Sequence, residues 1–529
     1  MKKLLTLLLA LMMIFSLTAC GSNETDDSSS DDSDSSDVSY KDTIVWAIAN
    51  DQDTLDPHQN VSNNVVIPQI YSTLVKIDMD NQLVGDLASE WSVDDSETLW
   101  TFKLRDDVTW QNGDHFTSAD VVATFDRLLN PDNGLRYCDQ YSAFIKAVTA
   151  VDDYTVTIET YTPYGPFLSA MAATSASIMN KNTIEQYGND IGMDPATING
   201  TGPFKVTSWT FQEEMVFERF DDYFDGAAKT KTIKMVYVPE QASRELALEN
   251  KEVDIASGLN PDDDVRIING EVEGVKLWSK AGNGMHLFQF NCSGVLADVN
   301  LRRAISHAID RQAIIDALYA QIGETCATAP ITPDVIGYSD LGVVEYDTDL
   351  AKELLKEAGY EDGLDITIYT TAVYNKGVEM GEIIKSQLAE VGINVNLVTI
   401  DRAQFLAQFG LTPEEVEWDM IIMGAGGQTD AGNALYRVWH TEEGGLNNNN
   451  YGFYSNAEVD SLLEQAAVIT DVEERTALYK QAMEIIWETD PVGVFMNFRN
   501  DIYGMLDEVE GFDANAGNTP DMKNIIVKA

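Results

Sequence analysis

The chain of 529 residues is poor in cysteine and histidine, the side chains on which most metal and redox sites depend. Its four cysteines stand at positions 20, 138, 292 and 326, and no two form a Cys-x-x-Cys pair. The five histidines are scattered singly, at positions 58, 115, 286, 307 and 440. A dedicated metal cage needs several converging nitrogen or sulfur donors, so we expect neither a metal centre nor a cofactor. The three cysteines beyond Cys20 permit one disulfide and leave one thiol over.

Basic residues are scarce too, with 34 Lys and Arg against 87 Asp and Glu, which gives a formal net charge of −53. Nucleic acid binding depends on Lys and Arg that neutralise phosphates, so that class of function is disfavoured. We interpret the acidity as a solubility device for a protein held outside the cell. No Gly-x-Ser-x-Gly nucleophile elbow is present, and carboxylates are too abundant for any pair to indicate a site. We therefore expect that the protein is not an enzyme.

The apolar run at the N-terminus, from Leu4 to Leu17, is too short to span a membrane, which needs about 20 apolar residues. Two lysines precede it and small residues end it, a pattern typical of a secretory signal. The ending Leu17-Thr18-Ala19-Cys20 resembles the bacterial lipobox. This resemblance implies that residues 1–19 are a signal peptide and that a lipid on Cys20 anchors the protein to the cell membrane. An ordinary signal peptide that happens to contain a cysteine is the alternative.

The next stretch, Ser22 to Ser39, consists almost entirely of Ser, Asp and Glu and contains no Lys or Arg. It cannot bury enough apolar surface to offset the entropy lost on ordering, so we expect it to be disordered. A flexible, self-repelling tether suits a domain held just beyond a lipid anchor. A low-complexity tail without a role is the alternative. In either case we expect a tether at 20–39 and folded chain from about Tyr40 onwards.

The remaining chain alternates short strands with helices. Alternating apolar residues predict strands, and apolar residues at helical spacing between a capping residue and a glycine predict helices. Asp349, for example, is expected to cap a helix that Gly359 ends. Strands that alternate with helices indicate an α/β protein with a largely parallel or mixed sheet. The predicted strands include 99–105, 204–209, 393–397 and 418–423, and the predicted helices include 117–129, 378–390, 458–469 and 472–489.

The loop after the strand at 418–423 is the first candidate for a ligand site, because ligands in such sheets sit at the carboxyl ends of strands. Glycines fill positions 424, 426 and 427, and a residue without a side chain lets the backbone approach a ligand closely. A flexible turn without a function is the alternative. Asp430 is expected either to bind a ligand amine or to cap the following helix.

A series of short motifs runs in order through the chain. It comprises Thr54–His58, Ile70–Val75, Leu87–Trp91, Trp100–Arg105, Asn112–Asp114, Phe116–Val122, Gly200–Phe204, Glu218–Arg219, Asp222–Phe224, Glu252–Ile255, Phe290–Asn291, Val299–Arg303, Ala308–Arg311 and Ala351–Tyr360. Any one of these motifs is weak, but the ordered series is specific. From about Thr43 to the C-terminus, the chain resembles the peptide/opine/nickel-type extracellular solute-binding proteins.

The resemblance implies an α/β, two-lobe periplasmic-binding-protein-like fold with two crossover hinge strands, near 287–291 and 492–498. A ligand binds between the lobes, which close over it by a hinge motion. The closed protein, expected to be a monomer, then passes its solute to the permease of an ABC importer. The expected parts are lobe I from residues 40–288 and 492–529, with an inserted subdomain at about 82–198, and lobe II from residues 289–491.

Short peptides are the ligands that the resemblance favours. In peptide binders of this family, an Asp after the strand equivalent to 418–423 holds the ligand amine. Alignment on Asn433 puts Gly427 at that place and Asp430 three positions later, so the amine anchor is missing or displaced. A nickel chelate, an opine or a sugar therefore stays open as the ligand, and so does a role as a peptide sensor for signalling. The candidate ligand-binding residues are Gly426, Gly427, Gln428, Thr429, Asp430, Trp439, Phe453 and Asn291.

The outlying candidates have structural alternatives. Aromatic residues such as Trp439 and Phe453 belong more often to the core of an α/β protein than to a cleft. The amide of Asn291 is expected at a crossover strand, where it can satisfy hinge backbone instead of a ligand. Arg302 and the neighbouring Arg303 fit a helix surface better than a carboxylate clamp. His440 is the histidine that we keep open as a contact for a metal–chelator complex.

Overall fold

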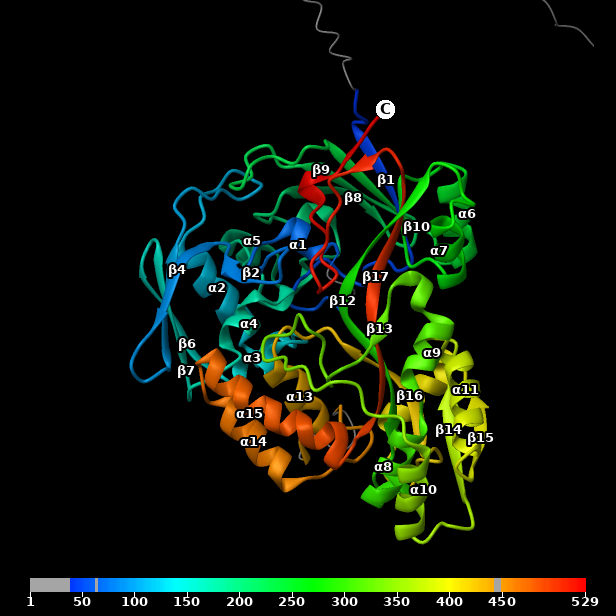
Figure 1. The fold of residues 1–529 in the computed structure, drawn as a ribbon. Coiled ribbons are helices and arrows are strands. Elements are labelled where there is room, and N and C mark those ends of the chain that lie inside the picture. The colour runs from blue at the N-terminus through cyan, green and yellow to red at the C-terminus, as the bar shows by residue number, and fades with distance from the viewer. Residues whose placement is uncertain (1–38, 62–64, 442–448) are drawn as a thin grey trace, which may run out of the picture. The chain divides into compact units, whose positions relative to one another are not determined.

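Two long antiparallel strands, β12 (Val275–Phe290) and β17 (Gly493–Leu506), run side by side through the middle of the protein (Figure 1). The computed structural model describes residues 39–61, 65–441 and 449–529. The expected signal peptide, Cys20 and the tether up to residue 38 lie outside these residues. In the described part of the chain, no helix is both long enough and apolar enough to cross a membrane.

Strands and helices alternate along the chain as the apolar spacing predicts. The other strands are β1 (Thr43–Ile48), β2 (Val75–Ile77), β3 (Leu83–Gly85), β4 (Ala88–Val93), β5 (Leu99–Leu104), β6 (Ile145–Asp152), β7 (Thr155–Thr160), β8 (Phe204–Thr210), β9 (Glu214–Arg219), β10 (Thr232–Tyr237), β11 (Ile255–Ser257), β13 (Thr325–Cys326), β14 (Leu364–Thr370), β15 (Ile393–Thr399), β16 (Met420–Gly426), β18 (Val509–Glu510) and β19 (Ile526–Val527). The helices are α1 (Ile67–Ile70), α2 (Ser118–Leu128), α3 (Cys138–Ser142), α4 (Phe167–Ala172), α5 (Lys181–Tyr187), α6 (Gln241–Glu249), α7 (Pro261–Ile268), α8 (Val299–Ala308), α9 (Arg311–Leu318), α10 (Thr348–Glu357), α11 (Gly377–Ala389), α12 (Arg402–Ala407), α13 (Ala431–Trp439), α14 (Ala457–Ala467) and α15 (Val472–Glu484). All eight elements predicted above are confirmed, with ends shifted by a few residues.

Two local predictions were wrong. Asp347, not Asp349, caps α10: its carboxylate accepts hydrogen bonds from the backbone N–H groups of Asp349 and Leu350, at 3.0 and 2.9 Å. Residues 424–426 (Gly-Ala-Gly), expected in a loop, continue β16, where they pair with residues 284–286 of β12. The strand is longer than its apolar run because the neighbouring strand satisfies the backbone groups of the glycines.

β12 and β17 are shared strands of one eleven-stranded sheet. β16, β14 and β15 follow on the side of β12, and β11, β1, β10, β9 and β8 follow on the side of β17. β1 pairs in parallel with β10 and β11, and β14 pairs in parallel with β15 and β16. The remaining pairs in this sheet are antiparallel, so the expectation of a mixed sheet is confirmed.

Each long strand belongs to more than one hydrophobic core. Val275 and Tyr503 lie in the core around β1, whereas Phe288 and Val494 lie in the core around β14 and β16. A separate antiparallel sheet, in the order β4-β5-β7-β6, lies within the stretch expected to form an inserted subdomain and has a core of its own. The exact boundaries of the lobes stay a prediction. The three described cysteines are free thiols.

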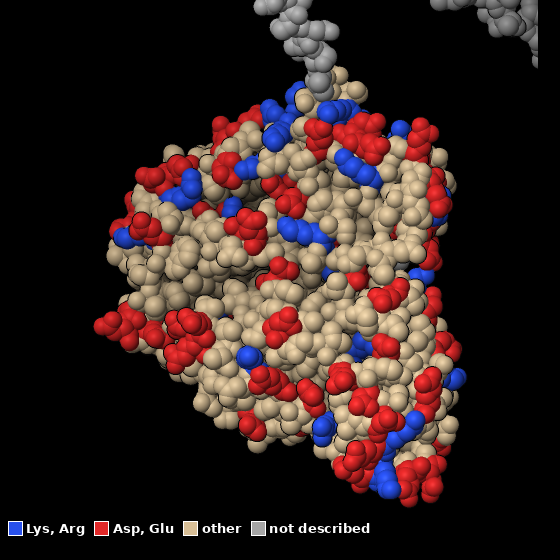
Figure 2. Space-filling model, in the orientation of Figure 1, with Lys and Arg blue, Asp and Glu red and all other residues tan. Residues whose placement is uncertain are grey.

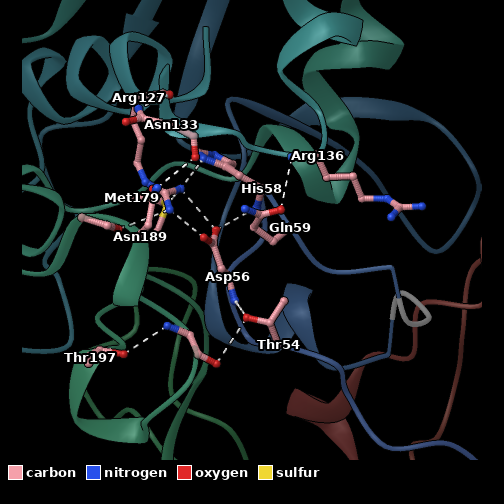
Figure 3. A network of polar contacts seen from close by, with 12 residues as sticks. Thr54, Asp56, His58, Gln59, Arg127, Asn133, Arg136, Met179, Asn189 and Thr197 are labelled. Carbon is pink, nitrogen blue, oxygen red and sulfur yellow. Dashed lines mark hydrogen bonds and ion pairs between the residues drawn. The ribbon is translucent and has the colours of Figure 1, made fainter. Parts of the chain in front are cut away.

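A buried polar network joins the segment before α1 to helix α2 of this subdomain (Figure 3). Arg127 Nη2 donates to Asp56 Oδ2 at 2.6 Å, and both side chains are buried. Arg127 Nη1 lies 2.8 Å from His58 Nδ1, and His58 Nε2 lies 3.3 Å from the carbonyl oxygen of Ser177. Because a guanidinium can only donate, Nδ1 accepts and the Nε2–H group donates to Ser177. His58 is therefore neutral, and burial lowers its pKa to about 4.

We predict that His58 makes the fold less stable as the pH falls from about 6.5 towards 4. In this window the unfolded chain takes up a proton on His58 and the folded chain does not, so acid favours unfolding. From neutral pH to about pH 5, the loss of unfolding free energy from this one residue amounts to about 2 kcal/mol. His58→Gln should lack this component, because the amide oxygen can still accept from Arg127 but does not titrate.

Urea unfolding of the two proteins at neutral pH and near pH 5 measures the difference. His286 is also buried, with a pKa lowered to about 3, but it contributes equally to both proteins and cancels. Equal losses of stability in wild type and variant would contradict the prediction.

Candidate ligand-binding site

Two adjoining cavities lie beside the central strands. We call them the smaller cavity, of about 290 Å³, and the larger cavity, of about 570 Å³. The smaller cavity is lined by β12, β16, α13 and residues 330–335. Gln428, Asn433 and Arg437 line both cavities, so one ligand can extend from the first into the second. Ligand pockets of about 300–1,000 Å³ are usual for small solutes.

The larger cavity has walls from both expected lobes. Residues 68–86, 169–177 and 515–523 lie on one side of it, and residues 427–437 lie on the other. The two sides also touch directly: the Tyr164 hydroxyl donates to Asn433 Oδ1 at 3.2 Å. The wall of lobe I includes Ser177, whose carbonyl oxygen is held by the His58 network. The larger cavity is therefore bordered by segments that lie far apart in the sequence.

Every second residue of β12 faces the smaller cavity, as expected for one face of a strand. These residues are Asn283, Met285, Leu287 and Gln289. Gln289 is 2% exposed, and its amide nitrogen has no hydrogen-bond partner in the described part of the chain. Leaving a buried donor unpaired costs about 1–3 kcal/mol. The position is therefore one that a hydrogen-bond acceptor on a ligand would relieve.

The glycines after Met423 are required by contacts within the protein. A Cβ atom on Gly426 would lie 2.1 Å from the carbonyl oxygen of Asn283, and one on Gly424 would lie 2.8 Å from the ring of Tyr374. Gly427 has a positive φ of 77° and lines the larger cavity. Gly426 lines the smaller cavity. These glycines let β16 approach β12 and also border both cavities.

Gln428 and Thr429 connect β16 to α13. The backbone carbonyl of Gln428 accepts a hydrogen bond from the amide of Asn283, and that of Thr429 accepts one from the backbone N–H of Ile336, at 3.0 Å. Gln428 borders both cavities and Thr429 borders the larger one. The structure therefore brings residues 426–429 together at the junction of the cavities.

Asp430 turns away from this junction and is fully buried. One carboxylate oxygen accepts from the backbone N–H of Gly432 at 2.8 Å, which caps α13. The other pairs with Arg475 and accepts from the Ser169 hydroxyl at 3.4 Å. Burial raises the pKa of Asp430, and Arg475 opposes this effect. Of the two roles considered for Asp430, the cap is the one that its contacts show.

The other candidates lie at different distances from the cavities. Trp439 lines the smaller cavity and also packs edge-on against Phe495, with ring centroids 6.2 Å apart. Phe453 is half-buried and borders neither cavity. The Asn291 amide donates to the carbonyl of Trp418 at 3.2 Å and accepts from the backbone N–H of Ser293 at 3.0 Å. These bonds hold backbone beside the crossover strand.

The expectation of a helix-surface role for Arg302 was wrong. Its guanidinium is buried, pairs with Asp490 and donates to the carbonyl of Pro491 at 2.9 Å. His440 is buried, stacks on Tyr436 with ring centroids 4.3 Å apart, and borders neither cavity. Among the described residues, no three His, Cys, Asp or Glu side chains form a group that could hold a metal ion.

Sequence reasoning missed Gln289, Asn433 and Arg437 as lining residues. The period-two pattern of β12 contained a signal for Gln289, because a polar residue on the buried face of a strand is unusual. Asn433 served only as an alignment marker. No local pattern distinguishes Arg437 from an ordinary basic residue near a helix end.

Comparisons with known proteins agree with this geometry. A model for bacterial extracellular solute-binding proteins, family 5 middle, matches residues 82–446. The glutathione-binding protein GsiB of Salmonella typhi is 29% identical over 460 residues, which cover 86% of this chain and 88% of that protein. The resemblance found in the sequence is confirmed.

Two solved structures share the fold. The ABC transporter-associated periplasmic binding protein DppA from Helicobacter pylori, in complex with the peptide STSA, is 25% identical, with a TM-score of 0.74 over 92% of this chain and 98% of its own. The PBP AgaA from A. tumefacien R10, in complex with agropinic acid, is 25% identical, with a TM-score of 0.72 over 92% of this chain and 99% of its own. The expected two-lobe fold of periplasmic binding proteins is confirmed.

We predict that Asp430→Asn lowers the unfolding free energy by about 3–5 kcal/mol, because Arg475 then stays buried without a counter-charge. Asparagine still caps a helix, so the loss isolates the ion pair. Urea unfolding measures the change. Asp471→Asn is the matched control, because Asp471 caps α15 by accepting from Glu474 at 2.8 Å but is exposed and has no ion pair in the described structure. A fully stable Asp430→Asn protein would show that the pair contributes nothing to folding.

Proposed function

Because the chain belongs to the bacterial extracellular solute-binding proteins of family 5, we propose that it captures a short peptide outside the membrane and delivers it to an ABC importer. The proteins of this family and the solved structures are substrate-binding transport proteins rather than enzymes. The supporting observation is the larger cavity, whose walls come from residues far apart in the chain and from both lobes.

A hinge between the lobes is part of this proposal. The pairing of β12 with β17 is irregular between Ala281 and Met285 and again between His286 and Leu287. Bends of this kind, at the ends of regular pairing, are where domain closure is absorbed. Contacts between the lobes in the present arrangement include Tyr164 with Asn433, the Ser169 hydroxyl with Asp430, and the backbone N–H of Gly165 with the carbonyl of Ala467 at 2.8 Å. Opening the lobes would break them.

The ligand class is supported by similarity alone. GsiB is a glutathione-binding protein, and DppA was solved with a bound peptide. AgaA was solved with agropinic acid, which makes a non-peptide solute the second candidate. The apolar wall of the smaller cavity suits the side chain of a peptide residue.

We also propose that the protein is a lipoprotein held by Cys20 and that it acts as a monomer at the permease. The basic start, short apolar run and Leu-x-x-Cys ending support a lipid anchor. The tether then keeps the folded part, from Tyr40 onwards, clear of the membrane surface.

We predict that peptides of two to eight residues or glutathione raise the unfolding temperature, whereas sugars and nickel–histidine do not. A ligand present at about 100 times its dissociation constant stabilises the fold by about 2.7 kcal/mol, which a thermal-shift assay detects. A saturating hit should also reduce the radius of gyration in small-angle scattering, because the lobes close. Sugars as the sole hits would overturn the peptide assignment, and an unchanged radius with confirmed binding would overturn the hinge.

We predict that Cys20→Ala releases the protein from the membrane into the medium while ligand binding persists, since the folded part is untouched. Fractionation of cells followed by a salt wash measures the distribution. Cys138→Ala is the control, because Cys138 is a buried free thiol, and it should stay with the membrane. Retention of Cys20→Ala on washed membranes would rule out the lipid anchor.

A further inference from the structure

Arg437 differs from the other charged side chains around the two cavities because it has no hydrogen-bond or ion-pair partner among the residues that the structure describes. It lies in the last turn of α13, is exposed, and lines both the smaller and the larger cavity. Within the described part of the chain, it makes no hydrogen bond and no ion pair. Its position at the junction means that a ligand reaching from one cavity into the other passes beside it.

The other Lys, Arg, Asp and Glu side chains that line the cavities are engaged. Asp430, which caps the same helix but borders neither cavity, pairs with Arg475. The partners of the rest are Lys76 with Asp86 at 3.2 Å, Lys523 with Asp225 at 2.6 Å, Asp78 with the backbone N–H of Asp80 at 2.9 Å, and Asp521 with the backbone N–H of Lys523 at 3.1 Å. The pairs lie on the lobe I side of the larger cavity, so none of them neutralises Arg437.

Acids outnumber bases by 87 to 34 in this protein, so acidic partners for a cation are available in number. Figure 2 shows acidic side chains spread over the face drawn, with basic side chains between them. Acidic side chains are thus plentiful on the face drawn, yet none of those that the structure describes pairs with Arg437. A guanidinium is also the side chain best suited to hold a carboxylate, because its planar fork forms two parallel hydrogen bonds.

The wall of the smaller cavity next to Arg437 indicates which chemical group of a ligand can lie beside this arginine. The smaller cavity is lined largely by apolar side chains, among them Leu287, Met423 and Trp439. Apolar surroundings lower the local dielectric and strengthen the attraction between opposite charges. Only the Gln289 amide, beyond Leu287 on β12, adds a buried unpartnered donor to this wall. The cavity therefore accepts an apolar group rather than a second charge.

We propose that Arg437 binds a carboxylate group of the ligand at the junction of the two cavities, with an adjoining apolar group in the smaller cavity. This assignment rests on the proposed function and names the chemistry of its substrate: a peptide-like solute with a free carboxylate and an apolar group next to it. The carboxylate of the solute, rather than its amine, then determines whether the protein binds it.

Four pools of solutes test the assignment by thermal shift and calorimetry: tripeptides with free carboxylates, the same tripeptides amidated, non-peptide organic acids, and neutral sugars. Wild type should bind the free-acid peptides about tenfold to a hundredfold more tightly than the amides, the usual effect of one charge-assisted hydrogen bond. Arg437→Gln should bind both peptide pools equally weakly. Arg402→Gln is the matched control, because Arg402 is exposed, has no ion pair in the described structure and borders neither cavity.

The outcomes separate this inference from the proposed function. Equal binding of free and amidated peptides by wild type, or a preference that survives in Arg437→Gln, overturns the carboxylate anchor and leaves the peptide function standing. Binding of organic acids alone, lost in Arg437→Gln, supports the anchor and overturns the peptide. Sugars as the sole ligands, or binding of no pool, overturn both. An unchanged urea midpoint for Arg437→Gln confirms that a loss of binding is not a loss of folding.

Discussion

The antiparallel pairing of β12 with β17 is the constraint on which the rest of the structure depends. The two strands are shared by both halves of the molecule, so each half completes its core against the same pair. The pairing of the two strands is irregular between Ala281 and Met285, and residues 282 and 284 in this stretch are glycines. A Cβ on Gly282 would lie 2.5 Å from the Asp501 carboxylate, so a larger residue there would require that side chain to move. The same stretch of β12 that contains the irregularity also begins the wall of the smaller cavity, so the proposed hinge and the candidate site share one strand.

The sequence patterns predicted elements well where the cause of the element is local. Apolar spacing located α11 and β15 to within two residues, because each has one buried face and an end marked by a glycine. The end of β16 was not predictable in this way. Its last three residues contain two glycines and no apolar face beyond Ala425, and they are ordered only because β12 pairs with them. Tertiary pairing thus overrode a local turn signal.

The candidate site was predictable in place but only partly in detail. The loop after β16 does lie at the junction of the cavities, as the rule for strand ends suggests. The role of Asp430 was left open because its partner, Arg475, lies 45 residues further on. The wall supplied by residues 68–86 and 169–177 carries no motif of its own for a ligand. These residues border the larger cavity only because the folded chain brings them opposite residues 427–437.

The arginines of this protein show why residue type alone could not identify the site. Arg127, Arg302 and Arg475 are buried, each paired with an aspartate and each donating to backbone carbonyls. Such pairs add little net stability, because the cost of removing both charges from water offsets their attraction, but breaking one leaves a buried charge alone. They therefore fix the relative positions of the segments that they join.

Among residues 39–61, 65–441 and 449–529, Arg437 has neither an aspartate nor a backbone carbonyl as its partner. At physiological salt the field of an exposed charge decays over about 8 Å, so the many acids elsewhere on the surface act only weakly at the junction of the cavities. A net charge of −53 is thus compatible with local recognition of an anion. Whether Arg437 is neutralised depends on whether an acid lies within contact distance of it. In the described structure, every acid that borders the cavities already contacts a lysine or a backbone N–H group. Among the described charged residues that border the cavities, Arg437 is therefore the one left without a partner, which is the basis for proposing it as the anchor of an anionic group.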